Sequence, residues 1–196
     1  MTAAPTVSVP LLEIDFEALC KINPDTAAWL HVPALDISYP VVYRKDREYY
    51  TKHTFEGTRN ANGAVFVEPF NGADFTDLNT FLYGHNSADG SMFGALHTLV
   101  YADTQTAENP WIRVYLKDGT VLTYRIYSFY VAKEDGESFR IIDGSGYDGY
   151  VRHTKREAQK DLPASFEEQP ALLTLSTCYG ETGTSERFLV HAVRVP

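Results

Sequence analysis

Hydrophobic positions along the chain predict short β-strands separated by polar turns. Apolar and β-branched residues fill brief runs, and Gly, Asn, Asp or Pro separates one run from the next. The clearest case is a hairpin in which Trp111 to Leu116 and Val121 to Val131 flank an Asp-Gly turn at 117–120. Further strands are expected at Trp29 to Val32, Ile37 to Val42, Gly63 to Glu68, Phe81 to Tyr83, Leu172 to Thr177 and Arg187 to Val195. Pro40 should confine its strand to an edge or a bulge.

Helical spacing is limited to the periphery of this pattern. Leu11 to Ile22 has apolar residues at intervals of three and four and stops at Asn23-Pro24. Met92 to Val100 suggests a short helix, and Tyr150 to Asp161 a charged helix that must pack through one narrow face, whereas 134–149 is a Gly-rich acidic loop. Seven or eight short strands with two or three outer helices predict a mainly β protein built as a closed or nearly closed barrel.

Length and net charge limit the number of domains and the classes of partner that this chain can have. At 196 residues the chain suits one domain, with residues 1–10 as a flexible lead-in and 11–196 as the folded unit. A net charge of −9 without any basic run argues against nucleic acid as a partner. No apolar stretch of about 18 residues and no signal peptide is evident. Cys20 and Cys178 are expected to be free thiols.

Cys178 is a candidate nucleophile. It comes at the exit of a predicted strand, and Arg187 opens the next one, at a sequence separation of 187 − 178 = 9 positions. A hairpin-like connection of this length can place a guanidinium beside a sulfur, and a nearby cation favours the reactive thiolate. The alternative is a small structural cysteine beside a solvated arginine, which is the commoner role of a cysteine.

His85 is the matching candidate for proton transfer. Gly84 ends the apolar run before it, so His85 lies at a strand exit in a polar loop, where an imidazole can accept or donate a proton at neutral pH. Cysteine peptidases combine a cysteine with a histidine that is distant in sequence and near in space. The separation here is 178 − 85 = 93 residues, and sequence alone cannot bring the two together.

Three motifs then resemble the signature blocks of the sortases. They are Leu-Tyr-Gly-His-Asn with Asp-Gly-Ser-Met-Phe at 82–93, Thr-Leu-Ser-Thr-Cys at 174–178, and Arg-Phe-Leu-Val-His-Ala at 187–192. The Tyr-Gly-His-Asn form and the block Ile-Ser-Tyr-Pro-Val-Val at 37–42 resemble class B in particular. The likeness extends from about Phe16 to Val195.

This resemblance implies a sortase-type barrel with an N-terminal helix and a helix between the sixth and seventh strands. It implies a transpeptidase without metal or cofactor, with Cys178 as nucleophile, His85 as acid and base, and Arg187 as a hydrogen-bond donor to the oxyanion or the substrate backbone. Its substrates would be a sorting motif of secreted proteins, cleaved after threonine, and a cell-wall peptide amine. Relatives act as monomers outside Gram-positive cells, held by an N-terminal membrane anchor that the segment before about Val9 would replace or follow.

Neighbouring residues yield weaker predictions. Strand alternation points Tyr83 and Ser176 toward the same mouth as His85 and Cys178, where they would line the peptide groove or simply pack. The main-chain N–H of Tyr179 is a possible second oxyanion donor. Asp89 could orient His85, although an Asp-Gly turn explains it better. The remaining histidines share no metal-ligand spacing and are expected to be structural or solvated: His31, His53, His97, His153 and His191, the last also weighed as an alternative base.

Other functions remain open at this point. A purely hydrolytic cysteine peptidase would use the same nucleophile with water as acceptor. A pilus-polymerising sortase would use a lysine of a pilin. A β-barrel binding module without activity would need neither residue.

Overall fold

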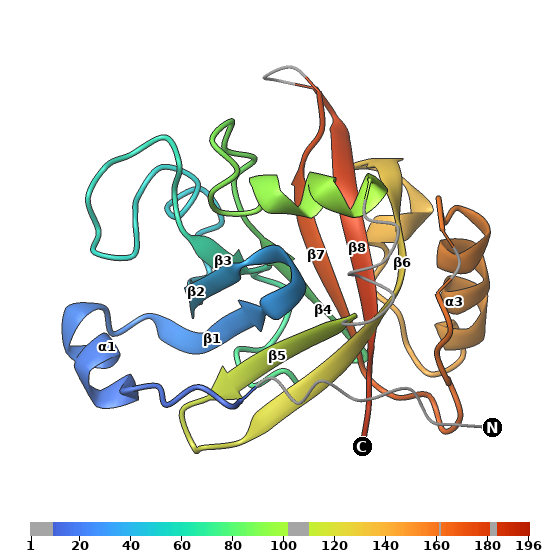
Figure 1. Cartoon of the computed structure of the whole chain (residues 1–196), viewed down its shortest axis with the longest axis horizontal. Coiled ribbons are helices and arrows are strands. Elements are labelled where there is room, and N and C mark those ends of the chain that lie inside the picture. The colour runs from blue at the N-terminus through green and yellow to red at the C-terminus, as the bar shows by residue number, and fades with distance from the viewer. Residues whose placement is uncertain (1–9, 102–109, 161, 181–183) are drawn as a thin grey trace.

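The centre of the molecule is a closed barrel of eight strands (Figure 1). The computed structural model describes residues 10–101, 110–160, 162–180 and 184–196. The strands are β1 (Thr26–Val32), β2 (Ile37–Val42), β3 (Val65–Val67), β4 (Asn79–Tyr83), β5 (Trp111–Leu116), β6 (Val121–Lys133), β7 (Leu172–Cys178) and β8 (Glu186–Arg194). Around the barrel they follow the order β1-β2-β3-β4-β7-β8-β6-β5, and β5 returns to β1. Only the β2–β3 and β4–β7 pairs are parallel.

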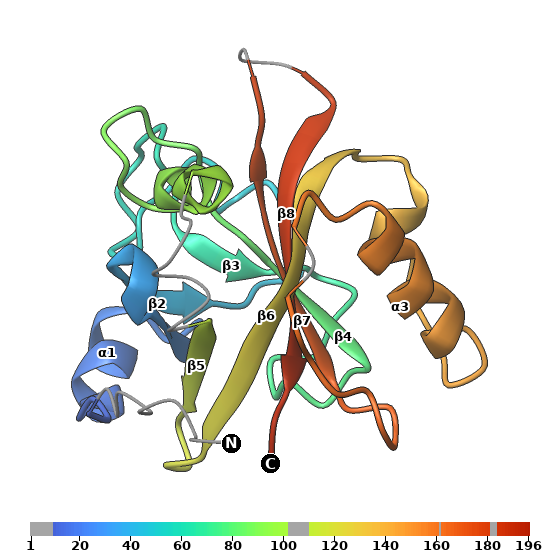
Figure 2. The ribbon, with the colours of Figure 1, turned by 45° about the vertical axis from the view of Figure 1, so that its right-hand side comes forward.

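Helices lie on the outside of this barrel (Figures 1 and 2). They are α1 (Phe16–Ile22), α3 (Tyr147–Arg156) and the 3₁₀ segments η1 (Pro33–Leu35), η2 (Gly94–Val100) and η3 (Glu137–Phe139). The first helix precedes the barrel, and α3 lies between β6 and β7. These positions confirm the predicted architecture. Of the described helices, none is long and apolar enough to cross a membrane.

Helix boundaries differ from those predicted because caps and packing set them. The first helix begins at Phe16, where the Asp15 carboxylate accepts a hydrogen bond from the Ala18 N–H at 2.9 Å and so caps the first turn. The later helix begins three residues earlier than expected because Tyr147 is fully buried and continues the packed face. Residues 92–100 contain a 3₁₀ segment rather than an α-helix.

Strand β2 is not the edge strand or bulge expected from Pro40, although Pro40 itself has a strand partner on one side only. Strand β2 lies between β1 and β3 in the closed barrel, and Pro40 pairs with Trp29. On the other side, β3 pairs only with Val41 and Val42. The missing N–H of the proline is therefore tolerated because no ladder hydrogen bond is needed on that side.

Side chains alternate between the barrel interior and an outer layer under α3. Along β8, Phe188, Val190 and Ala192 belong to the interior core, whereas Val193 packs in a separate cluster with Tyr147 of α3. Burying each large apolar side chain contributes roughly 1.5–3 kcal/mol. The two layers hold β7 and β8 from both faces. Their register, which positions the candidate site, is thereby fixed.

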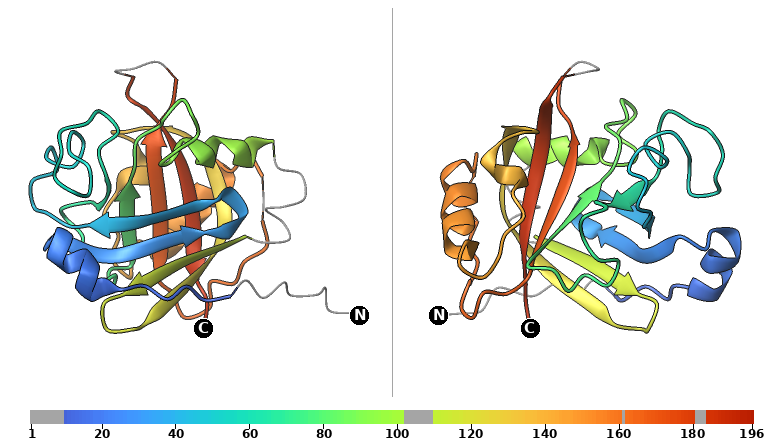
Figure 3. Two further views of the ribbon diagram at one scale, coloured as in Figure 1. Left: turned by 60° about the vertical axis from the view of Figure 1, so that its left-hand side comes forward. Right: turned by 180° about the vertical axis from the view of Figure 1, so that it is seen from behind.

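The predicted lead-in, residues 1–10, lies outside the described residues except for Pro10. The Pro10 carbonyl accepts a hydrogen bond from the Arg113 guanidinium at 3.1 Å. The C-terminus lies at the end of the barrel opposite the last residues of β7 (Figure 3).

Candidate active site

The β7–β8 ladder brings the predicted nucleophile and cation together. Cys178 is the last residue of β7, and its Cα partner across the ladder is Arg187. Directly opposed residues project their side chains from the same face of the sheet. Cys178 is exposed to solvent, while the Arg187 side chain is only 16% exposed. The exposed cysteine and the largely buried arginine therefore lie on the same face of the ladder and line the same pocket.

Parallel pairing of β4 with β7 places His85 at the same level of the barrel. Tyr83 is in register with Ser176, and the Gly84 N–H donates to the Ser176 carbonyl at 3.2 Å. His85 and Cys178 each lie two residues beyond this pair, on strands that are spaced about 4.8 Å apart. Figure 1 shows the loop after β4 at the same end of the barrel as the last residues of β7 and the first residues of β8.

The loop that carries His85 folds back on itself and is anchored at its far end. A Cβ atom on Gly84 would lie 2.6 Å from the Phe93 ring, so only glycine permits this approach. The Phe93 N–H donates to the His85 carbonyl at 3.0 Å, and the Met92 N–H donates to the Tyr39 hydroxyl at 3.0 Å. These contacts fix the His85 backbone. Within the described part of the chain no hydrogen bond fixes its imidazole, which can therefore turn toward a substrate.

A pocket of about 230 Å³ joins the three predicted catalytic residues. Its lining comes from the 44–64 segment, the ends of β3, β4 and β7, and the starts of the β6–β7 connection and β8. The lining residues are Arg47, Glu48, Tyr50, Thr51, Asn62, Ala64, Phe66, Tyr83, Gly84, His85, Glu134, Ser176, Thr177, Cys178 and Arg187.

Arg187 is held by three hydrogen bonds. Its Nη1 donates to the carbonyls of Thr184 and Glu186, at 2.8 and 2.9 Å, and its Nη2 donates to Glu134 Oε2 at 2.7 Å. A guanidinium carries five N–H groups. Two of them therefore have no partner among the described residues and remain for a ligand.

A row of alternating charges continues from Arg187 along the pocket wall. The other oxygen of Glu134 pairs with Arg47 at 3.0 Å, and Arg47 Nε lies 3.4 Å from Glu68. The Arg47 guanidinium lies over the Tyr83 ring, 4.8 Å from its centroid. Burial raises the pKa of Glu68, while the nearby Arg47 opposes that shift. Burial also raises the pKa of Tyr83 well above its usual value, which keeps its hydroxyl neutral and able to donate to Glu68.

The three weaker site predictions have different outcomes. Tyr83 and Ser176 both line the pocket. The Ser176 hydroxyl is buried and has no hydrogen-bond partner among the described residues. The Tyr179 side chain points away from the Cys178 face of the hairpin, and its ring packs against His97 and Phe188. Its N–H already donates to the Glu186 carbonyl at 3.0 Å, so the expected second oxyanion donor is engaged.

Asp89 and His191 are not part of the site. The Asp89 carboxylate accepts hydrogen bonds from the Ser91 N–H and hydroxyl, which lower its pKa, and so forms a turn. His191 is fully buried and bonds to the hydroxyls of Thr174 and Tyr130 at 2.9 and 3.1 Å. The turn interpretation of Asp89 and the structural interpretation of His191 are confirmed.

Sequence reasoning missed four residues around the site. Arg47, Glu68 and Glu134 come from three separate segments, and their pairing leaves no pattern in the sequence. His97 of η2 packs behind the nucleophile against Phe188, with a ring-centroid distance of 4.9 Å. Burial lowers the pKa of His97, and a hydrogen bond with the Cys178 main chain opposes that shift.

Both cysteines are free, as predicted. Among the described residues, no group of three or more His, Cys, Asp or Glu side chains is arranged to bind a metal ion.

Comparison with known proteins places this geometry in a family. The model of the sortase domain matches residues 30–195. Sortase B of Listeria monocytogenes is 27% identical over 164 residues, which cover 82% of this chain and 65% of that protein. Sortase B of Staphylococcus aureus is 27% identical over 172 residues, covering 85% of this chain and 70% of that protein. This chain thus spans just under two thirds of the Listeria protein.

Solved structures agree with this match. Sortase B of Clostridium perfringens superposes with a TM-score of 0.80 at 25% identity, covering 93% of this chain and all of that one. A complex of Staphylococcus aureus sortase B with its substrate superposes with a TM-score of 0.83 at 25% identity, covering 92% of this chain and 84% of that one. The barrel and its peripheral helices are therefore those of class B sortases.

Proposed function

This chain belongs to the sortase family, and from that premise we propose that it is a class B sortase, a cysteine transpeptidase that joins a sorting peptide to an amine. One observation carries the proposal: Cys178 and Arg187 form a cross-strand pair, and His85 lines the same pocket. A nucleophile, a cation and a proton carrier are the groups that acyl transfer through a thioester requires.

In the first half of the reaction, Cys178 acts as a thiolate after its proton has passed to His85, and its sulfur attacks the carbonyl carbon of a threonine in the sorting peptide. The carbonyl oxygen gains the negative charge of a tetrahedral intermediate. Arg187 supports this step because two of its N–H groups remain unpaired, and its positive charge compensates the developing oxyanion. The engaged N–H of Tyr179 leaves Arg187 as the principal donor among the predicted ones.

His85 transfers the protons. When the intermediate collapses, the carbon–nitrogen bond breaks, and the imidazolium of His85 protonates the departing amine, leaving a thioester on Cys178. The incoming amine then attacks the thioester carbonyl and gives its proton to His85, and the thiolate leaves. The unrestrained imidazole supports both steps, since one ring must reach a leaving and an entering nitrogen.

The peptide is expected to bind across Tyr83 and Ser176. Both residues line the pocket that also contains His85 and Cys178, which supports this placement. The resemblance to class B suggests a motif similar to Asn-Pro-x-Thr-Asn/Gly, a cell-wall peptide amine as acceptor, and action as a monomer at the outer face of a Gram-positive membrane through an N-terminal anchor. These details are part of the proposal.

Mass spectrometry tests the proposal directly. The protein is incubated with a library of threonine-containing sorting peptides, and the acyl-enzyme is identified by its mass at Cys178. Oligoglycine, a diamino acid and a lysine-containing pilin peptide are then added as competing acceptors. Ligated product supports the transpeptidase, and the preferred amine separates wall anchoring from pilus polymerisation. An acyl-enzyme that only hydrolyses would show a peptidase, and a protein that never acylates would refute both.

A further inference from the structure

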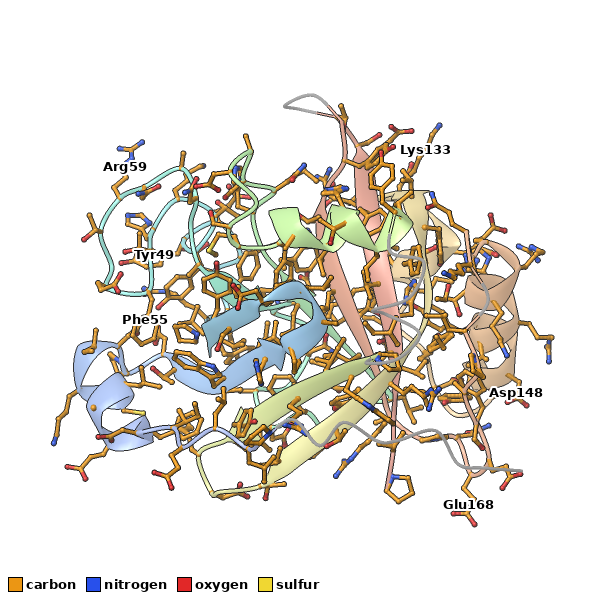
Figure 4. The ribbon with its side chains drawn as sticks, viewed as in Figure 1. Tyr49, Phe55, Arg59, Lys133, Asp148 and Glu168 are labelled. Carbon is orange, nitrogen blue, oxygen red and sulfur yellow. The ribbon has the colours of Figure 1, made fainter. Side chains whose placement is uncertain are left out.

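Glu134 is the residue outside the predicted trio that is most directly tied to it. It follows β6 immediately, and its N–H donates to the Ser185 carbonyl at 2.9 Å, so the β6–β8 ladder fixes its backbone. Because Ala132 is the Cα partner of Arg187, Glu134 lies on the same face and one diagonal step away. Diagonal neighbours of this kind are within reach of long side chains. Figure 4 shows the adjoining Lys133 at the end of the barrel where β7 and β8 connect.

The Glu134 carboxylate bridges two guanidinium groups. Oε2 accepts from Arg187 at 2.7 Å and Oε1 accepts from Arg47 at 3.0 Å, and the Glu134 side chain is 35% exposed. Charge-assisted bonds of this length are among the stronger side-chain contacts. Arg47 is in turn paired with Glu68, whose side chain is 8% exposed. Both oxygens of the Glu134 carboxylate are therefore bonded to guanidinium groups, and Arg47 links the carboxylate to the buried side chain of Glu68.

We propose that Glu134 is a positioning residue that fixes the Arg187 guanidinium beside Cys178 and directs its two unpaired N–H groups into the pocket. The physical reason is preorganisation. A charged donor stabilises an oxyanion most when its orientation needs no adjustment during the reaction. The carbonyls of Thr184 and Glu186 restrain Nη1 alone. The bond from Nη2 to Glu134 adds a second point of attachment, which stops the guanidinium plane from rotating.

The competing hypothesis is that the Glu134 carboxylate slows the reaction. A carboxylate so close to Arg187 also reduces the positive potential at the oxyanion. If this reduction in potential, here called damping, were the larger effect, removing the negative charge of Glu134 would speed acylation. The sign of the change in rate therefore decides between positioning and damping.

The kinetic test rests on the proposed function and uses Glu134→Gln, with Glu137→Gln as the matched control. Glu137 lies on the same connection, is 56% exposed, and pairs with Arg140 and His153 rather than with any residue of the pocket. In single-turnover acylation by a sorting peptide, Glu134→Gln should lower the maximal rate about tenfold, with the peptide concentration at half-maximal rate changed less than about twofold. The control should match the parent protein.

A double-mutant comparison shows whether Glu134 acts through Arg187. In an Arg187→Ala background, adding Glu134→Gln should cause no further loss. An equal loss in both backgrounds, no loss in the parent background, or a faster rate would each overturn the proposal. Thermal unfolding checks that the variants are folded. Glu134→Asp, which retains the charge but is one methylene shorter, repeats the test if Glu134→Gln does not fold.

NMR gives a readout that does not depend on turnover. The Arg187 guanidinium N–H signals, assigned by comparison with Arg187→Lys, should exchange slowly with water in the parent protein and rapidly in Glu134→Gln. Unchanged exchange would overturn the proposal. If the parent protein formed no acyl-enzyme with any peptide, the proposed function would fail, while this measurement would still decide whether Glu134 restrains Arg187.

Discussion

Two polar pairs lie on the same β7–β8 ladder, four residues apart, and they have opposite surroundings. Cys178 faces Arg187 at the mouth of the pocket (the outer pair), and Thr174 faces His191 in the buried layer between the barrel and α3 (the inner pair). By residue type and geometry, Thr174 and His191 resemble a nucleophile hydrogen-bonded to its base, with 2.9 Å between Oγ1 and Nδ1. Both residues are completely buried, however. The comparison teaches that access to substrate, rather than the residue types alone, separates a reactive pair from a structural one.

Hydrogen bonding reinforces this difference. The Thr174 hydroxyl also bonds to Asn79, and His191 Nε2 bonds to the Tyr130 hydroxyl, so every polar atom of the inner pair has a partner. At the mouth, Arg187 keeps two N–H groups free, and neither His85 nor Cys178 has a side-chain hydrogen bond among the described residues. Satisfied buried groups stabilise a fold. Unsatisfied groups at an open pocket are available to bind a substrate.

The largest effect should come from removing the sulfur. Cys178→Ala should abolish acyl-enzyme formation, because no other accessible nucleophile occupies the pocket end of β7. Cys20→Ala removes the other thiol, on α1, and should leave the rate unchanged. Mass spectrometry of the peptide-treated proteins measures both variants. An acyl group on Cys178→Ala would show that the wrong residue was identified as the nucleophile.

Loss of the cation should have the next largest effect. Arg187→Gln is expected to lower the acylation rate by about 10²–10³, the usual cost of losing an oxyanion donor. Its melting temperature should change little, because Glu134 keeps its pair with Arg47. Stopped-flow or quenched acylation and thermal unfolding would be compared. A large loss of stability with an unchanged acylation rate would show that Arg187 has a structural role rather than the catalytic role given to the outer pair.

Acid should destabilise the protein through the inner pair. Burial lowers the pKa of His191 from 6.5 to about 3, assisted by the charge of His153. The folded state therefore binds fewer protons than the unfolded chain, and this contribution to stability is complete above pH 6.5 and declines as the pH falls toward 3. At 1.36 kcal/mol for each unit, the full loss is at most about 5 kcal/mol. Urea unfolding at several pH values measures it.

A variant isolates the contribution of this histidine. His191→Gln should be less stable at neutral pH but should show a shallower decline between pH 6.5 and 3 than the parent protein. Parallel pH profiles for the two proteins would mean that other groups cause the acid sensitivity.

The smallest effect should follow from Thr174→Val. This change keeps the shape of the side chain but leaves His191 Nδ1 and Asn79 Oδ1 without a hydroxyl partner. The expected loss is about 1–3 kcal/mol in the free energy of unfolding, with the acylation rate unchanged. Denaturant unfolding and the acylation assay measure the two quantities. A fall in rate comparable to that of Arg187→Gln would show that the inner pair takes part in catalysis.

Local patterns predicted most elements of this fold. The 111–116 strand has the predicted bounds, and β6 extends only two residues beyond its predicted end. Alternation along β8 correctly separated the face of Phe188 from that of His191. Predictions failed where a distant contact decided the outcome, as at Pro40, where ring closure removed the expected edge, and at Tyr179, whose N–H is bonded across the hairpin.

By itself, the sequence determined the strand periodicity, the strand exits at Cys178 and His85, and the motifs that identify the family, because each depends on residues that are close along the chain. Only the tertiary structure decided that residues 93 positions apart share one pocket and that Glu134 links Arg187 to Arg47. Pairing between β4 and β7, and between β6 and β8, creates these contacts. A carboxylate meets its guanidinium partners through the register of distant strands, and no local spacing encodes that register.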